Sequence, residues 1–288
     1  MLFKKNQFYV IVAFLTLNTF QVIAQQAWTK EKGKFYAQVG GSALGYNQAL
    51  NGKVKPTEWT ALNANFRDIT LQAYGEYGIS NRLTVSAQLP LKFLSSSKIV
   101  QPNTITEGSL AGLSNIQAAL TANIYNKDGI VVSGKVNFSL PTARFDAKTG
   151  LRTGFDAFST EPSLLVGFGH SKFFASGELG YVLRTNGYAN RTHVAAQIGK
   201  FLGKQKKWIG IFGFELMKTA SNGTYNDATS TKTALYLSNQ SYLSPTLKFG
   251  YKTTSKVTLW LSVGTGVAPI TKNIAASLGP SLSVSYQN

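Results

Sequence analysis

The sequence has no cysteine and only two histidines, His170 and His193. The absence of cysteine excludes disulfide frameworks, thiolate metal sites and cysteine nucleophiles. Two histidines argue against a multi-histidine metal site, and glycine motifs that cradle phosphate are absent although the chain has 27 glycines. We therefore expect no metal, no cofactor and no catalytic residue.

Charged residues are also scarce, since they make up 14% of the 288 residues against roughly 25% in an average soluble domain. The mean hydropathy is −0.04. After residue 24 the sequence has no apolar run that approaches the roughly 20 residues of a membrane-spanning helix. The sequence thus specifies an unusual surface, but it does not encode a helical membrane protein.

The first 24 residues have the three parts of a secretory signal peptide. Lys4 and Lys5 precede an apolar stretch at residues 8–17, and a Val-Ile-Ala tripeptide at 22–24 precedes Gln25. No cysteine follows, so a lipoprotein anchor is not expected. We predict a signal peptide at residues 1–24 and one mature domain at residues 25–288.

The charge balance is strongly basic, with 29 Lys and Arg against 12 Asp and Glu and a formal net charge of +17. Removal of the signal peptide takes away only two of the basic residues. Nucleic acid is a poor partner for an exported protein. The partners that we expect are outer-membrane lipid, lipopolysaccharide and small-molecule solutes, whose anionic groups suit this charge.

Apolar residues alternate with small or polar ones through most of the chain. In residues 257–264, Val257, Leu259, Leu261 and Val263 occupy every second position. This period of two places successive side chains on opposite faces of a strand. The same alternation occurs at 69–76, 83–92, 132–139 and 281–286, which indicates an all-β protein.

Short and long connections alternate between the expected strands, as in an up-and-down barrel with tight turns at one end and loops at the other. Asp128-Gly129 is a strong hairpin signal in one of the tight turns. We predict a transmembrane antiparallel β-barrel of about 12 strands in the cell outer membrane. The strands are expected near 34–46, 66–78, 82–94, 113–125, 130–140, 161–170, 172–184, 191–201, 207–218, 237–251, 256–267 and 275–287.

Aromatic residues fall near the expected strand ends, which predicts the two aromatic girdles of such barrels. The girdle at the tight-turn end would consist of Phe35, Tyr77, Tyr125, Phe173, Phe201, Trp208, Tyr251 and Tyr286. The other girdle would contain Phe66, Phe93, Phe138, Tyr181 and Phe214. Pro245 and Pro280 fit less well, because proline inside a strand removes a hydrogen-bond donor.

The phase of the alternation directs a set of polar and aromatic side chains into the barrel. A lipid-facing Lys or Arg would cost about 2–4 kcal/mol at the membrane midplane, which supports this assignment. The charges either pair across the lumen and stiffen the barrel or select solutes. The expected lumen-lining residues are Tyr74, Glu76, Lys92, Lys135, Glu178, Arg184, Glu215, Lys248 and Trp260.

Two other functions are compatible with such a barrel. A lipid hydrolase commonly carries a His and a Ser two residues apart on one strand face, but neither His170-Ser171 nor His193-Val194 gives this spacing. A structural or assembly barrel would hold a periplasmic partner on a basic rim. Lys204, Lys206 and Lys207 form either such a rim or a solvated turn.

Seven segments carry a further signal, at residues 77–85, 89–91, 112–116, 140–142, 153–156, 161–164 and 180–184. In this order they resemble a bacterial outer-membrane family of transporters linked to the meta-pathway of phenol degradation. Ala143 stands where the family pattern has Gly after Leu-Pro-Thr. The resemblance implies a barrel that admits small, often aromatic or hydrophobic molecules. We therefore predict a channel or transporter for small solutes that performs no covalent chemistry.

Overall fold

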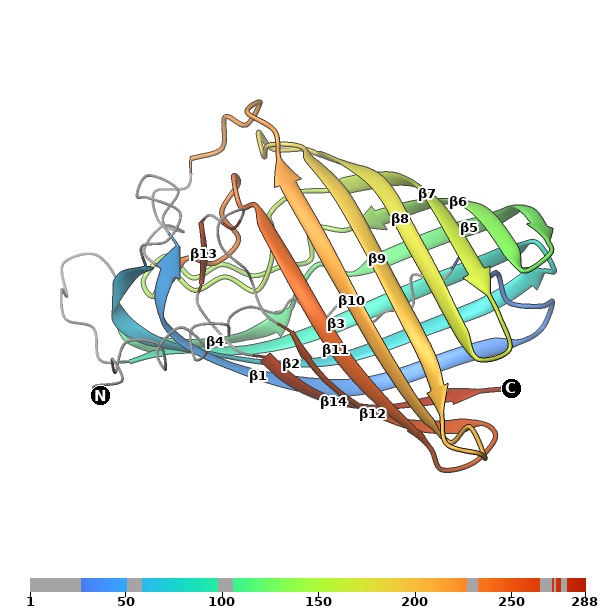
Figure 1. The fold of residues 1–288 in the computed structure, drawn as a ribbon. Helices are drawn as coiled ribbons and strands as arrows, with labels where there is room; N and C mark the ends of the chain where they lie inside the picture. The colour runs from blue at the N-terminus through green and yellow to red at the C-terminus, as the bar shows by residue number, and fades with distance from the viewer. Residues whose placement is uncertain are drawn as a thin grey trace, which may run out of the picture.

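In the computed structural model a single antiparallel sheet closes on itself (Figure 1). The structure describes residues 27–50, 59–97, 106–226, 233–264, 271, 273–275 and 279–288, and the predicted signal peptide lies outside them. The first strand pairs with the second on one side and with the last on the other, which closes the barrel. Among the residues that the structure describes, no helix is long and apolar enough to cross a membrane.

The barrel wall has 12 strands, two of which are interrupted. β4 and β5 both pair with β3, and β13 and β14 both pair with β1, so each of these pairs forms one broken wall strand. This confirms the predicted fold class. The strands are β1 (Phe35–Leu50), β2 (Trp59–Ser80), β3 (Leu83–Ser97), β4 (Gly108–Leu113), β5 (Gln117–Lys127), β6 (Ile130–Ser139), β7 (Ser159–Gly169), β8 (Phe173–Arg184), β9 (Arg191–Leu202), β10 (Trp208–Thr219), β11 (Tyr242–Lys252), β12 (Val257–Gly264), β13 (Ile274–Ala275) and β14 (Gly279–Gln287).

The short turns lie together at one end of the barrel, with the C-terminus, and the long connections lie at the other (Figure 1). Asp128 and Gly129 form the predicted two-residue hairpin between β5 and β6, with φ of 53° and 80°. Both values are positive, as a type I′ turn requires. Three boundaries were wrong. Part of residues 47–65, which lie between two expected strands, is strand, because β1 and β2 pair again beyond a bulge after Tyr46. The strand expected at 237–251 begins only at Tyr242, and the one expected at 113–125 is interrupted at residues 114–116.

The outer face of the wall is apolar and exposed, whereas the inner face is polar and buried. Leu282 and Leu179 are 67% and 58% exposed, while Ser133 is fully buried. Burying a side chain such as leucine stabilises a protein by about 1.5–3 kcal/mol. A whole belt of exposed apolar side chains is therefore unfavourable in water. The outer face is therefore that of a transmembrane barrel, in contact with lipid.

Most of the aromatic residues examined lie near the strand ends as expected. At the short-turn end, Phe35 stacks on Tyr286 with ring centroids 5.5 Å apart, and Trp208 lies 4.6 Å from Tyr251. The prediction for Phe66 was wrong, because this residue is only 3% exposed. Phe66 shares the inward phase of the polar residues that follow it in β2, and it stacks on a tyrosine inside the barrel.

Pro245 and Pro280, which fitted the predicted strands poorly, each lie next to the end of a strand pairing. The described pairing of β11 with β12 ends at Thr246 and Gly264, one residue from Pro245. The described pairing of β14 with β1 begins at Ser281, one residue after Pro280. Each proline thus lies where one side of its strand has no ladder partner among the described residues, so the missing N–H is tolerated.

Candidate functional site in the barrel interior

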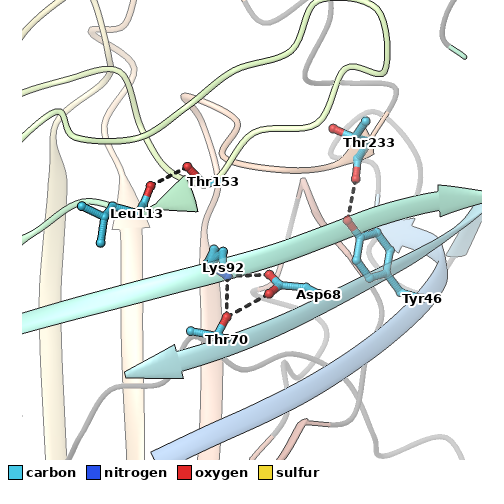
Figure 2. A network of polar contacts seen from close by, with 7 residues as sticks. All are labelled: Tyr46, Asp68, Thr70, Lys92, Leu113, Thr153 and Thr233. Atoms are coloured by element: carbon cyan, nitrogen blue, oxygen red, sulfur yellow. Dashed lines mark hydrogen bonds and ion pairs between the residues drawn. The ribbon is translucent and has the colours of Figure 1, made fainter. Parts of the chain in front are cut away.

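The loop between β6 and β7 folds into the barrel and is tied to the break between β4 and β5. Asn115, in that break, donates hydrogen bonds to the carbonyls of Leu140 (2.8 Å) and Phe155 (2.7 Å), and its Oδ1 accepts one from the Phe155 N–H (2.7 Å). Thr153 Oγ1 donates to the Leu113 carbonyl at 2.7 Å (Figure 2). These bonds fix Phe155 inside the loop end of the barrel.

Two further loops meet the first one there. The Arg184 guanidinium donates to the carbonyls of Ala189 and, at 2.6 Å, Ser238. The Ala189 N–H donates to Ser238 Oγ at 2.9 Å. Tyr46 OH donates to the Thr233 carbonyl at 3.1 Å (Figure 2), so β1 also contacts the loop that precedes β11. The loops therefore narrow this end of the lumen.

Arginines and aromatic rings alternate around Phe155. The guanidinium carbons of Arg184 and Arg191 lie 5.1 Å and 4.6 Å from the centroid of its ring. Tyr188 and Tyr236 meet the ring edge-on, at centroid distances of 5.5 Å and 5.1 Å. Burial raises the pKa of both tyrosines, so they remain neutral hydrogen-bonding groups at physiological pH.

The segment before β1 narrows the opposite end. Ala27 is fully buried, and its carbonyl accepts a hydrogen bond from Ser133 Oγ at 2.5 Å. The ring of Trp28 lies against Gly167, where an added Cβ would lie 2.9 Å from the ring. Lys30 Nζ lies 3.2 Å from Glu76 Oε2. Residues 27–30 thus lie inside the barrel at the short-turn end, whereas residues 31–34 are exposed.

Between these two ends lies a cavity of about 310 Å³. Its volume is at the lower limit of small-molecule sites, which typically measure 300–1,000 Å³. Its lining is mixed, with aromatic rings at both ends and charged groups between them. Residues that line it include Trp28, Tyr74, Glu76, Lys92, Lys135, Phe155, Glu161, Arg184, Arg191 and Tyr236.

Three of the nine expected lumen residues belong to networks on β2 and β3. Lys92 Nζ lies 2.5 Å from Asp68 Oδ2 and donates to Thr70 Oγ1 at 3.0 Å (Figure 2). Tyr74 OH donates to Glu76 Oε1 at 2.7 Å. Each charge in these networks lies beside an opposite charge.

Three others belong to a second cluster, on β6, β8 and β10. Lys135 Nζ lies 2.5 Å from Glu178 Oε1. Glu215 Oε1 accepts a hydrogen bond from Tyr242 OH at 2.8 Å. His193 lies between them, with Nδ1 2.5 Å from Glu161 Oε1 and Nε2 3.8 Å from Glu215 Oε1.

The remaining expected residues lie apart from these clusters. Lys248 Nζ lies 4.3 Å from the ring centroid of Trp260, whose Nε1 donates to Ser285 Oγ at 2.9 Å. Arg184 belongs to the loop network described above. The structure thus places the nine residues in separate groups along the lumen.

Sequence reasoning did not assign Asp68, Glu161 or His193 to the lumen. Asp68 carries the inward phase of Thr70 and Gln72 one step further towards the N-terminus, so the alternation itself contained the signal. Glu161 falls at the start of the strand expected at 161–170, and the alternation did not indicate which face its side chain takes. His193 was considered only as a catalytic base, and its lumen position follows from the phase of β9.

Comparison with known proteins gives the fold and the family. No curated protein matches the sequence. The COG4313 outer membrane channel from Pseudomonas putida F1 is 13% identical, with coverage of 93% of this chain and 100% of that one and a TM-score of 0.68. A TodX mutant, a monoaromatic hydrocarbon channel, is 9% identical, with 96% coverage of each chain and a TM-score of 0.51. These similarities show that the fold is that of outer-membrane channels.

The sequence matches the family described as "Putative MetA-pathway of phenol degradation" over residues 18–282. The match spans nearly the whole chain, including the C-terminal third, beyond the segments that carried the resemblance. The chain belongs to this family.

Proposed function

We propose that the protein is an outer-membrane channel that passes small solutes with an aromatic or hydrophobic body and performs no covalent chemistry. The observation that carries the proposal is the cavity of about 310 Å³ inside a barrel whose outer face is apolar. A barrel with this interior has room for one small molecule at a time, which is the arrangement of a selective channel rather than of a wide pore.

The chemistry of the lining supports this solute class. Phe155 and Trp28 place aromatic surfaces at the two ends of the cavity, where a planar ring can stack. Arg184, which also lines the cavity, adds a guanidinium that can donate to a hydroxyl or a carboxylate. A channel of similar fold is described as one for monoaromatic hydrocarbons, which fits the same class.

The narrowed ends imply slow and selective passage. A solute must move past the loops around Phe155 and past the segment at residues 27–30, both of which are held by hydrogen bonds. We therefore expect a low ion conductance in planar bilayers. Small aromatic molecules should cross faster than sugars of equal mass, because only a flat apolar body gains contacts with the lining.

A liposome assay with the purified protein tests the proposal. Entry of small aromatic acids and alcohols above the rate of protein-free liposomes is expected, with little entry of disaccharides. Phe155→Ala should change the ratio of aromatic to sugar entry, while Phe249→Ala, a lipid-facing substitution on β11, should leave it unchanged. No entry of any solute above the lipid background would overturn the proposal.

No observation favours the two other functions considered from the sequence. The two ring nitrogens of His193 lie beside the carboxylates of Glu161 and Glu215, and neither group is a serine hydroxyl. Lys204, Lys206 and Lys207 occupy the exposed turn between β9 and β10, where Lys206 Nζ donates to the Ser171 carbonyl at 3.0 Å. A docking role for this turn stays a prediction.

A further inference from the structure

We propose that Lys248, together with the hydroxyl groups of Ser262 and Ser281, binds the carboxylate of an anionic solute on the inner wall of the barrel. The three residues lie on β11, β12 and β14 and are not among those that line the cavity, so this is a separate site. The inference rests on the proposed function in that the lumen is the route by which the solute arrives. It narrows the solute class to molecules that carry one carboxylate.

Lys248 differs from three other lysines inside the barrel in having no carboxylate beside it. Lys30, Lys92 and Lys135 each lie 3.2 Å or less from a carboxylate oxygen. Lys248 is only 6% exposed, and among the residues that the structure describes no carboxylate forms an ion pair with it. A buried charge is costly unless it is compensated. A bound carboxylate would supply the missing negative charge.

The indole ring of Trp260 holds the ammonium group in place. Lys248 Nζ lies 4.3 Å from the centroid of this ring, which is a cation–π contact. The ring is fixed on one side because its Nε1 donates to Ser285 Oγ at 2.9 Å. On the other side it lies over Gly250, its register partner, where an added Cβ would lie 2.4 Å from the ring. The ring attracts the ammonium group without neutralising it, so the site keeps a net positive charge.

A row of hydroxyl groups connects Lys248 to the cavity. Each residue of this row lies directly opposite the next one on the neighbouring strand, and such residues have Cβ atoms about 4.5–5.5 Å apart. Two members of the row, Ser42 and Thr70, line the cavity. Hydroxyl groups along this path can replace the water around a carboxylate as it moves towards the lysine. The row consists of Lys248 of β11, Ser262 of β12, Ser281 of β14, Ser42 of β1 and Thr70 of β2.

Ser262 and Ser281 supply hydrogen-bond donors beside the lysine. Their hydroxyl groups form a hydrogen bond with each other, and Ser281 Oγ donates to the Ser262 carbonyl at 3.5 Å. A hydroxyl hydrogen rotates about its C–O bond, so one of these donors can turn towards a bound carboxylate. One ammonium group with one or two hydroxyl donors matches a single negative charge. The site therefore favours a monocarboxylate over a dianion such as phosphate.

Calorimetric titration of the protein in detergent micelles at neutral pH tests the proposal, with benzoate as the probe and benzyl alcohol as its neutral counterpart. Benzoate should bind at one site per chain, and benzyl alcohol should bind more weakly by about tenfold or more, because a hydrogen bond to a charged group is lost. Lys248→Met should lower the affinity for benzoate to that for benzyl alcohol, whereas Lys248→Arg should retain most of it.

Lys252→Met is the matched control. Lys252 lies on the same strand, and its Nζ is 4.9 Å from the ring centroid of Phe201. This variant should bind benzoate as the unmodified protein does. Equal affinity of the unmodified protein for benzoate and benzyl alcohol, or equal loss in Lys248→Met and Lys252→Met, would overturn the proposal.

Photolabelling of the unmodified protein with 4-azidobenzoate covers the case in which Lys248→Met does not fold. Peptide mass spectrometry should find the label on β11, β12 or β14, and labelling confined to other strands would overturn the proposal. The result is separable from that of the channel assay. Benzoate binding in micelles without entry of any solute into liposomes contradicts the channel but supports this site. Entry of aromatic solutes with equal affinity for benzoate and benzyl alcohol contradicts this site but not the channel.

Discussion

Two polar networks in the lumen differ in the balance of their charges. On β2 and β3, Lys92 faces a single carboxylate, that of Asp68. On β6 to β10, Lys135 shares its surroundings with three carboxylates and one imidazole. In the first network one lysine meets one carboxylate, whereas in the second a lysine and an imidazole meet three carboxylates. The two networks therefore differ in how many groups share each charge.

The first network also has complete hydrogen bonding around its charges. Thr70 Oγ1 donates to Asp68 Oδ1 at 2.8 Å and accepts from Lys92 Nζ at 3.0 Å (Figure 2). Lys92 Nζ lies 5.8 Å from the ring centroid of Tyr236, in the loop before β11. This network thus joins two wall strands to an inward loop, which is a structural task.

The largest expected effect is the loss of one partner of the balanced pair. Lys92→Met leaves the buried Asp68 carboxylate without its cation, and we expect a loss of about 3–5 kcal/mol in the free energy of unfolding. The double variant Asp68→Asn with Lys92→Met should recover most of this loss, since no charge remains. Urea unfolding in lipid vesicles, followed by tryptophan fluorescence, measures both.

This prediction fails if the single and double variants are equally stable. Such a result would mean that water reaches Asp68 and screens its charge. The pair would then be a solvent-screened ion pair that contributes little to stability, and the two networks would not differ in this respect.

A smaller effect is expected at Gly180, in the second network. Gly180→Ala should cost about 1–3 kcal/mol, because the new methyl group overlaps Glu161 Oε1. Gly210→Ala is the matched control, since a Cβ there meets only Leu202 Cδ1 at an ordinary 3.7 Å. Equal stability of the two variants in the same unfolding assay would show that Glu161 does not need the space over β8.

The sequence predicted the wall far better than the interior. A period of two reports which face a side chain takes, so the strands and the polar phase of Glu178 and Lys92 could be read directly. Neighbours across strands depend on register, and no local pattern places Glu178 and Glu215 opposite the same residue, Ala195. The inward path of the loop around Phe155 rests on Asn115, 40 residues away. Such long-range contacts leave no periodic signal.

A still smaller effect is expected for one carboxylate of the second network. Glu215→Gln removes one of three negative charges while Tyr242 OH keeps an oxygen acceptor. We expect the free energy of unfolding to change by less than about 1 kcal/mol. A loss as large as that of Lys92→Met would show that Glu215 is as tightly balanced as Asp68, contrary to the comparison.

The smallest effect concerns Asp146, a partly exposed carboxyl in the inward loop, whose pKa is set mainly by hydrogen bonds. The Lys148 N–H and Thr149 Oγ1 both donate to it at 3.0 Å, and the Lys148 N–H, above all, holds the pKa of Asp146 below its ordinary value of 3.8. A lowered pKa in the folded state means that the turn is stabilised above pH 3.8 and loses this stabilisation as the pH falls through the lowered value. Carboxyl NMR titration in micelles should therefore give a midpoint below 3.8 for Asp146. The Lys148 amide should exchange faster with solvent below that midpoint, and Asp146→Asn should abolish this pH dependence because its amide does not titrate. A midpoint at or above 3.8 would mean that the two hydrogen bonds do not persist in solution, and the exposed turn would then contribute nothing to fixing the loop that carries Phe155.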